Sequence, residues 1–395
     1  MKRVRVLYYL SMLVLLLAGL ATGRREYFFV LCIMFLVICY AAVLNIWTFL
    51  SFSFVQELSD NSVVNGASPV FKIGIYNDKP FPFTMMKIAV QTPLPTEYVE
   101  LSFNLDPQSN IHYDITLNCV YRGVYDVGMT TIEINDVFGL LCMRFDLRML
   151  PYYRHKKLTI YPRLVQLPYL PAQICDAKYA GGGVQQISEE GESFSDTRQY
   201  RFGDPFKRVH RTLSMRKREL FVKRYDVPME TSAIIVLDTA VNCYEGEKLL
   251  HFADLACECA TAIAYYSLRA GYVVALTGAA ENRAIVDGKS SSDFAKLYDE
   301  LAVIPFDVEG DICNTLRREI NKHPNLKAVY VITSRRDPAI IDVLRSMSQT
   351  GCAVKCIVPA PGVVEKNHQQ QMPSGVATAM LSNSDDIAKV LSEIM

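Results

Sequence analysis

Two long uncharged stretches at the amino end of this 395-residue chain restrict its fold more than any other feature. The first covers residues 7–21, the second covers residues 27–54, and only a short charged segment separates them. A helix of about 20 apolar residues is long enough to cross a bilayer. Helices also satisfy their backbone polar groups without water, as a membrane demands. We therefore predict a transmembrane hairpin with helices at about residues 7–23 and 27–50.

Charges around this hairpin indicate its orientation. Lys2, Arg3 and Arg5 precede the first helix, and basic residues favour the cytoplasmic side, although Arg24 and Arg25 in the turn weigh against this orientation. Two crossings return the chain to the side on which it starts. The eleven cysteines include no Cys-x-x-Cys pair, which indicates reduced thiols. We expect a multi-pass protein of the cell membrane whose soluble domains lie in the cytoplasm.

Residues 57–163 show the period of two that is typical of half-buried strands. Ile111, Tyr113, Ile115 and Leu117 alternate with polar residues, and Pro, Gly and Asn-Asp turns separate several such runs. Short alternating runs between turns favour a β-sandwich, of the Ig-like kind.

The remainder of the chain alternates strands with helices. Continuous apolar runs predict buried strands at residues 233–237, 272–277, 328–333 and 353–358, and helical patterns predict helices at residues 247–270, 293–301, 311–322 and 338–350, with a closing helix after Ser384. This alternation gives an α/β fold, a doubly wound, mainly parallel sheet with helices on both faces. The expected parts are a membrane hairpin (1–56), a β-sandwich domain (57–163), a linker with a basic segment (164–229) and an α/β domain (230–395).

The basic segment leads directly into the first of these strands. Ten Lys or Arg residues lie between residues 198 and 224, although the whole chain balances 41 basic against 41 acidic residues. The strand ends at Asp238, at the edge where open α/β sheets bind ligands. The basic segment also contains aromatic residues, namely Tyr200, Phe202, Phe206 and Phe221. We expect them to anchor the segment in a core rather than to stack on nucleic-acid bases.

Several motifs in this part of the chain and upstream of it occur in a recognisable order. They are Tyr121-Arg122-Gly123-Val-Tyr125, Asp136-Val-Phe138-Gly139-Leu140, Tyr161-Pro162-Arg163, Arg198-Gln-Tyr200-Arg-Phe-Gly203-Asp204, Val209-His210, Arg216 and Leu220-Phe-Val-Lys223. In this order they resemble the domain-of-unknown-function 58 family, and with the hairpin the resemblance covers nearly the whole chain. It implies a membrane hairpin, a β-rich domain and a domain similar to von Willebrand factor A. It also implies association with MoxR-type AAA+ ATPases, transglutaminase-like proteins and other von Willebrand factor A proteins, but no settled activity.

The resemblance raises the question of a metal site. A metal site of the von Willebrand factor A type uses Asp-x-Ser-x-Ser, because one carboxylate and two hydroxyls give magnesium a hard oxygen shell. Here Asp238, Ala240 and Asn242 stand at these positions, and Ala240 offers no side-chain oxygen. Ser334 stands where such sites often place a second aspartate, and Asp337 follows it. We expect no metal or other cofactor. The remaining candidates for metal ligands are Asp238, Asn242 and Thr277.

Catalytic motifs are missing from the sequence. It has no Gly-x-Ser-x-Gly elbow and no His-Glu-x-x-His. Asp238 and His210 alone do not make up the nucleophile, base and orienting group that catalysis needs. We expect a membrane-anchored, non-catalytic scaffold or adaptor that works with a MoxR-type AAA+ ATPase, without nucleic acid. The alternatives are a magnesium-dependent ligand-binding domain and a hydrolase. The candidate binding residues are Arg198, Tyr200, Asp204, His210, Arg216, Lys223 and Asp238. The competing interpretation is that Arg198, Asp204 and Arg216 pair internally and tie the basic segment onto the sheet.

Overall fold

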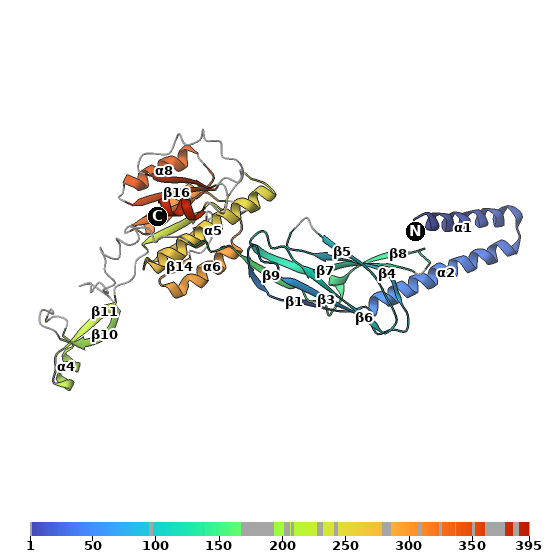
Figure 1. The fold of residues 1–395 in the computed structure, drawn as a ribbon, viewed down its shortest axis with the longest axis horizontal. Coiled ribbons are helices and arrows are strands. Elements are labelled where there is room, and N and C mark those ends of the chain that lie inside the picture. The colour runs from blue at the N-terminus through green and yellow to red at the C-terminus, as the bar shows by residue number, and fades with distance from the viewer. Residues whose placement is uncertain are drawn as a thin grey trace. The chain divides into compact units, whose positions relative to one another are not determined.

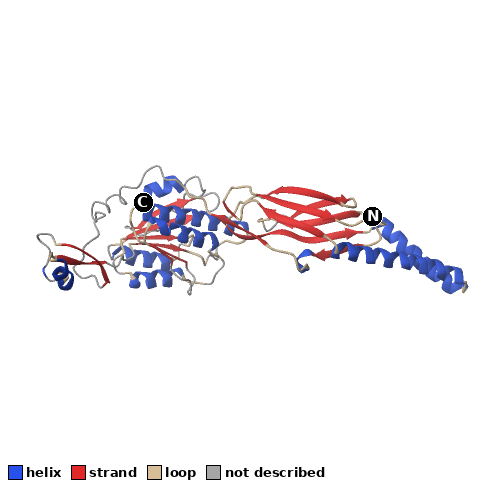
Figure 2. Cartoon of the chain, turned by 90° about the horizontal axis from the view of Figure 1, so that it is seen from below, coloured by secondary structure: helices blue, strands red, loops and turns tan. Residues whose placement is uncertain are grey.

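The computed structural model shows a mixed α/β chain that divides into two compact units, Met1–Tyr161 and Pro162–Met395 (Figure 1). Figure 2 shows two helices followed by strands in the first unit, and helices on both faces of a sheet in the second. The structure describes residues 2–94, 98–136, 138–166, 193–200, 206, 209–226, 232–240, 244–278, 286–306, 310–323, 326–335, 337–349, 352–359, 376–381 and 387–394.

Two helices open the first unit. They are α1 (Lys2–Thr22) and α2 (Arg25–Leu50), and both are long and apolar enough to cross a membrane. The helices pack closely, since a Cβ atom on Gly19 would stand 3.2 Å from the ring of Phe28. The two predicted apolar helices are confirmed, and the first begins at Lys2 rather than at residue 7.

Two sheets follow in the first unit. The smaller sheet has the order β1-β3-β6 and consists of β1 (Ser53–Leu58), β3 (Val70–Asn77) and β6 (Ser109–Thr116). The larger sheet has the order β2-β9-β7-β4-β5, with β8 paired to β7, and consists of β2 (Ser62–Val64), β4 (Phe83–Gln91), β5 (Tyr98–Leu105), β7 (Gly123–Asn135), β8 (Cys142–Asp146) and β9 (Lys156–Tyr161). A short 3-10 helix, η1 (Leu147–Met149), lies between β8 and β9.

One hydrophobic core joins the two sheets. Phe71 and Ile75 of β3 are fully buried in the same cluster as Ile88 of β4 and Ile132 of β7. Successive side chains of a strand point to opposite faces, so every second residue of these strands enters the core. The period of two in the sequence arises from this arrangement.

The second unit contains a six-stranded sheet of order β14-β13-β12-β15-β16-β17. Its strands are β12 (Ala233–Leu237), β13 (Val274–Gly278), β14 (Val286–Gly288), β15 (Ala328–Ile332), β16 (Ala353–Pro359) and β17 (Val376–Leu381). All neighbouring pairs are parallel except β13 with β14, so β14 is an antiparallel edge strand.

Helices cover both faces of this sheet. They are α5 (Glu247–Arg269), η3 (Ser291–Asp293), α6 (Phe294–Val303), α7 (Ile312–Lys322), α8 (Pro338–Gln349) and α9 (Ile387–Ile394). Ile235 of β12 lies in one core with Phe252 of α5, whereas Val236 lies in a second core with Leu344 of α8. All five residues of β12 are buried, as expected of a strand covered on both faces.

The longest described helix of this unit ends at a glycine. Gly271 follows α5 with a φ of 88°, in the left-handed region that glycine favours. Its N–H donates to the carbonyl of Leu268 at 3.0 Å, and the N–H of Tyr272 donates to Ser267 at 3.0 Å. These two bonds form a Schellman motif, which satisfies the last carbonyls of the helix.

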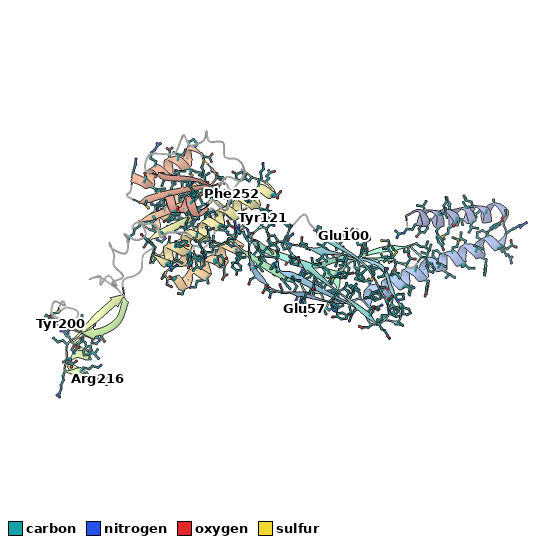
Figure 3. All side chains as sticks on the ribbon, in the orientation of Figure 1. Glu57, Glu100, Tyr121, Tyr200, Arg216 and Phe252 are labelled. Carbon is teal, nitrogen blue, oxygen red and sulfur yellow. The ribbon has the colours of Figure 1, made fainter. Side chains whose placement is uncertain are left out.

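Part of the basic segment forms a small antiparallel hairpin, which we call the α4 hairpin. It consists of β10 (Ser193–Gln199), α4 (Arg211–Lys217) and β11 (Phe221–Asp226). The Oγ of Ser214 accepts from the N–H of Phe221 at 2.9 Å, which fastens α4 to β11. Figure 3 shows Tyr200 and Arg216 on this hairpin.

Candidate functional site

The edge of the second sheet has one point where the strand order reverses. β12 is followed in the chain by β13 on one side, while the later strand β15 lies on its other side. In open α/β sheets the crevice beyond the carboxyl ends of such strands is the usual binding position. The residues that leave β12 and β15 here are Asp238, Thr239, Thr333, Ser334 and Arg335.

Asp238 is the centre of this switch-point site. It is fully buried, and its backbone N–H donates to the carbonyl of Ile332 at 2.9 Å, which ties it to β15. Its Oδ2 accepts a hydrogen bond from the Oγ1 of Thr333 at 2.6 Å. The same oxygen lies 3.3 Å from the Nε of Arg335, whose side chain is only 17% exposed. A buried carboxylate and an internal guanidinium therefore form an ion pair at the switch point.

Burial dominates the electrostatics of this carboxyl group. Desolvation raises the pKa of Asp238 above its ordinary value, and Thr333 and Arg335 counteract the rise without cancelling it. The negative charge of Asp337 adds to the rise. The Asp238 anion thus depends on Arg335, since buried charges are stable only when they are paired.

Several polar atoms of the site have no hydrogen-bond partner among the described residues. They are Oδ1 of Asp238, Oγ1 of Thr239, Oγ of Ser334 and Nη2 of Arg335. Buried polar atoms are almost always hydrogen-bonded, so four exceptions at one strand edge distinguish this place from the rest of the sheet. This concentration makes it the candidate functional site of the second unit.

The described residues supply only part of the Asp-x-Ser-x-Ser oxygen pattern. Ala240 is buried and has no side-chain oxygen, and Asn242 lies outside the described residues. Oγ1 of Thr277 donates to the carbonyl of Gly278 at 3.4 Å. Magnesium takes six oxygen ligands, usually with carboxylates among them, whereas here the carboxylate of Asp238 already faces the cation Arg335. The described part of the chain holds no cluster of three or more His, Cys, Asp or Glu side chains.

The α4 hairpin carries the other candidate residues. His210 caps α4, because its Nδ1 accepts from the N–H of Leu213 at 3.2 Å. Tyr200 packs on Phe206 with ring centroids 5.4 Å apart, and Arg216 is exposed (Figure 3). Lys223 is half-buried on β11.

The structure does not bring the predicted residues together as one described site. The side-chain partners of Asp238 are Thr333 and Arg335, and no residue of the α4 hairpin is among its described partners. Arg198 pairs with Val222 along the backbone of the hairpin, but its side chain lies outside the described residues. Asp204 also lies outside them, so internal pairing of the three signature residues stays a prediction.

Sequence reasoning missed Thr333 and Arg335. Thr333 is the last residue of the strand predicted at residues 328–333, and Arg335 follows it. The observed strand, β15, ends at Ile332 and lies beside β12 at the same edge. The signal was a polar run directly after a buried strand. It identifies partners of Asp238 only once the strand order is known.

A second buried carboxylate explains one of the motifs upstream. Glu258 of α5 is buried, and its Oε1 lies 2.9 Å from Nε of Arg163. The Oη of Tyr298 donates to the carbonyl of Pro162 at 2.7 Å. These contacts fasten the start of the second unit to α5 and α6, so the Pro162-Arg163 pair has a structural role.

Comparisons with known proteins add one clear match. Residues 196–374 match the family model described as "Protein of unknown function DUF58". This range holds most of the α4 hairpin and all strands of the α/β sheet except β17. No curated protein matches the chain.

Among solved structures, three similar chains illustrate the likeness. Proximal thread matrix protein 1 from the mussel byssus is 13% identical with a TM-score of 0.31, covering 42% of this chain and 46% of its own. A second crystal form of the same protein is 14% identical with a TM-score of 0.29, covering 42% of this chain and 47% of its own. A GH20 exo-β-N-acetylglucosaminidase from Vibrio harveyi is 9% identical with a TM-score of 0.19, covering 79% of this chain and 58% of its own. The chain thus spans less than two thirds of each of these proteins, and the low TM-scores establish no shared fold.

Proposed function

We propose that this protein is a membrane-anchored, non-catalytic interaction protein that serves as an adaptor for a MoxR-type AAA+ ATPase. The observation that carries this proposal is the ion pair of Asp238 with Arg335 at the switch point. An internal guanidinium supplies the positive charge that a bound cation would otherwise bring to this carboxylate. Recognition of another protein then remains as the role of the second unit.

A hydrolytic role lacks the required arrangement of groups. A nucleophile needs a base within hydrogen-bond reach, and the described side-chain partners of the Asp238 carboxylate are a hydroxyl and a guanidinium. The Nδ1 of His210 is used to cap α4. The described residues therefore support binding better than catalysis.

The architecture supports a von Willebrand factor A-like assignment for the second unit and an Ig-like assignment for the strands of the first. The order β14-β13-β12-β15-β16-β17 reads as 3-2-1-4-5-6 in chain order, with the third strand antiparallel at the edge. The first unit has two sheets around one core. The signature that resembles the domain-of-unknown-function 58 family implies both domains and the MoxR-type partner.

The α4 hairpin offers a surface for such a partner. Arg211, Arg216 and Arg218 are exposed, and beside them Met215 is 76% and Phe206 is 71% exposed. The prediction that Phe206 anchors a core is wrong, because this ring packs on Tyr200 and leaves most of its surface open. Arginine, methionine and aromatic side chains are enriched at protein interfaces. We call Arg211, Arg216 and Arg218 the basic surface of α4.

The two apolar helices support a membrane placement. We propose that α1 and α2 cross the membrane and that the remainder lies in the cytoplasm. Arg5 near the start of α1 and the other basic residues before it favour the cytoplasmic side. Seven of the described cysteines are free thiols, in agreement with a reducing compartment: Cys32, Cys39, Cys119, Cys142, Cys259, Cys313 and Cys352.

Capture of the ATPase by the full chain tests this function. The full chain in detergent is immobilised, and a MoxR-type AAA+ ATPase from the same organism is passed over it with ATP. We expect saturable capture, and no capture of an AAA+ ATPase of another class. If no MoxR-type ATPase of the organism is retained in any nucleotide state, the adaptor role is wrong.

A further inference from the structure

A pocket of about 280 Å³ lies in the first unit, at the end of α2 that meets the strands. Three segments line it: the last turns of α2, the loop between β3 and β4, and the turn after β7. The lining residues used below are Leu44, Asn45, Trp47, Lys79, Phe81 and Phe138. Neither the switch-point site nor the α4 hairpin contributes to it.

The loop between β3 and β4 is held in place by one asparagine. Nδ2 of Asn77 donates to the carbonyl of Phe81 at 2.8 Å and to the carbonyl of Asp106 at 2.9 Å. The ring of Phe81 lies 4.9 Å from that of Trp47, which joins this loop to α2. This wall of the pocket is therefore preformed.

The turn after β7 is fixed by Asp136 and by α1. The carboxylate of Asp136 accepts from the N–H of Leu141 at 2.6 Å and from the N–H of Phe138 at 3.1 Å. Nε of Arg5 donates to the carbonyl of Gly139 at 2.7 Å. The start of α1 and the end of α2 thus reach the same end of the strands.

This position places the pocket at the depth of lipid headgroups if the two helices cross the bilayer. Trp47 is 45% exposed and Phe138 is 56% exposed at this end. Aromatic side chains are enriched at both membrane–water interfaces, where one end of the ring is apolar and the other is wet. The mouth of the pocket is therefore accessible to membrane lipid.

Two polar groups of the pocket point to the chemistry of its ligand. Asn45 is only 3% exposed, and its Nδ2 has no hydrogen-bond partner among the described residues. Such a buried donor needs an acceptor such as an ester carbonyl. Lys79 is half-buried and forms no ion pair with a described residue, so its ammonium group is open to an anion such as a phosphate.

We propose that this pocket binds an anionic glycerophospholipid of the bilayer. Leu44, Phe81 and Phe138 offer apolar contacts to the start of an acyl chain, Asn45 donates to an ester carbonyl, and Lys79 faces the phosphate. Pockets for whole small molecules have roughly 300–1,000 Å³, so this pocket holds the glycerol ester region and part of one chain while the rest stays in the bilayer. The inference depends on the membrane placement proposed above.

Native mass spectrometry of the full chain tests this proposal. The protein is released from nanodiscs of equal amounts of phosphatidylglycerol and phosphatidylcholine with identical chains. We expect the wild type to retain phosphatidylglycerol about fivefold over phosphatidylcholine, the factor that one basic residue contributes at an anionic membrane surface. Lys79→Glu should remove this preference, and Asn45→Leu should lower the retention of both lipids.

Matched controls separate the specific site from general attraction. Lys156→Glu makes the same charge change in the same unit outside the pocket, and it should retain phosphatidylglycerol like the wild type. Equal loss in both lysine variants, or equal retention of the two lipids by the wild type, would overturn the proposal. Displacement by millimolar glycerol phosphate would also overturn it, because the ligand would then be a soluble phosphate.

Failure of the lipid site and failure of the membrane placement give different results. The same membranes are washed with alkaline carbonate before the nanodiscs are made. Protein that resists the wash but carries no lipid contradicts the lipid site alone. Protein that the wash releases contradicts the membrane placement as well. Thermal unfolding of each variant confirms that a lost lipid does not reflect a lost fold.

Discussion

Replacing Arg335 by methionine is expected to lower the free energy of unfolding of the second unit by about 3–5 kcal/mol near neutral pH, because it leaves a buried carboxylate without its cation. Asp238 is fully buried, and Arg335 is its ion-pair partner. The measurement is hydrogen exchange of the β12 and β15 peptides in the full chain, followed in increasing urea. Arg335→Lys keeps the positive charge and should lower the free energy of unfolding by less.

This loss should depend on pH in one direction. The pKa of Asp238 is already raised by burial, and removal of Arg335 raises it further. A carboxyl whose pKa is higher in the folded than in the unfolded state destabilises the fold as pH rises above the unfolded value. The deficit of Arg335→Met should therefore be largest at mildly alkaline pH and shrink toward the pKa of a free aspartate.

A double variant tests whether the two residues act as a pair. Adding Asp238→Asn to Arg335→Met removes the stranded charge, so much of the lost stability and most of the pH dependence should return. Residues that interact give such non-additive effects in a double-mutant cycle. Equal deficits in the single and the double variant, at every pH, would show that Arg335 does not stabilise the Asp238 anion.

Charge reversal on the basic surface of α4 is expected to weaken capture of the ATPase partner about tenfold or more, which is at least about 1.4 kcal/mol. The variant is Arg211→Glu, Arg216→Glu and Arg218→Glu, and all three side chains are exposed. Exposed charges contribute little to stability, so the melting temperature should change little. Binding is measured by surface plasmon resonance at several salt concentrations, and the wild type should lose affinity as salt rises.

A matched triple variant controls for net charge. Lys248, Lys289 and Lys327 are exposed in the same unit and lie outside the α4 hairpin. Replacing these three lysines by Glu changes the total charge of the chain as much as the triple α4 variant does. We expect capture to be retained in this control. If the control loses as much affinity as the α4 variant, or if the α4 variant binds like the wild type, the basic surface is not the interface.

The sequence predicted those elements whose pattern is local. The run at residues 233–237 has no polar residue, and β12 covers these same residues because helices bury both of its faces. The helix predicted at residues 247–270 was found at nearly the same bounds, and Gly271 follows it in a left-handed backbone that few other residues adopt without strain. The two apolar helices were also predictable, because each is a long local run of apolar residues.

Features that depend on tertiary pairing were not predictable. The partner of Asp238 is Arg335, about a hundred residues away, and only the strand order brings them to one edge. β17 (Val376–Leu381) is a half-exposed edge strand without clear alternation, so its sequence gave no signal. Asn45 occurs in an apolar helix, and nothing local shows that its amide lines a pocket.

The central claim is that an internal guanidinium takes the place of a metal ion at Asp238. Its most direct test is thermal unfolding of the full chain in detergent with and without magnesium, at matched ionic strength. A site with a millimolar Kd would add about 1.4 kcal/mol at a tenfold excess of metal, enough to raise the Tm by a few degrees. We expect the same Tm with and without magnesium. A magnesium-dependent rise that disappears in Asp238→Asn would contradict it.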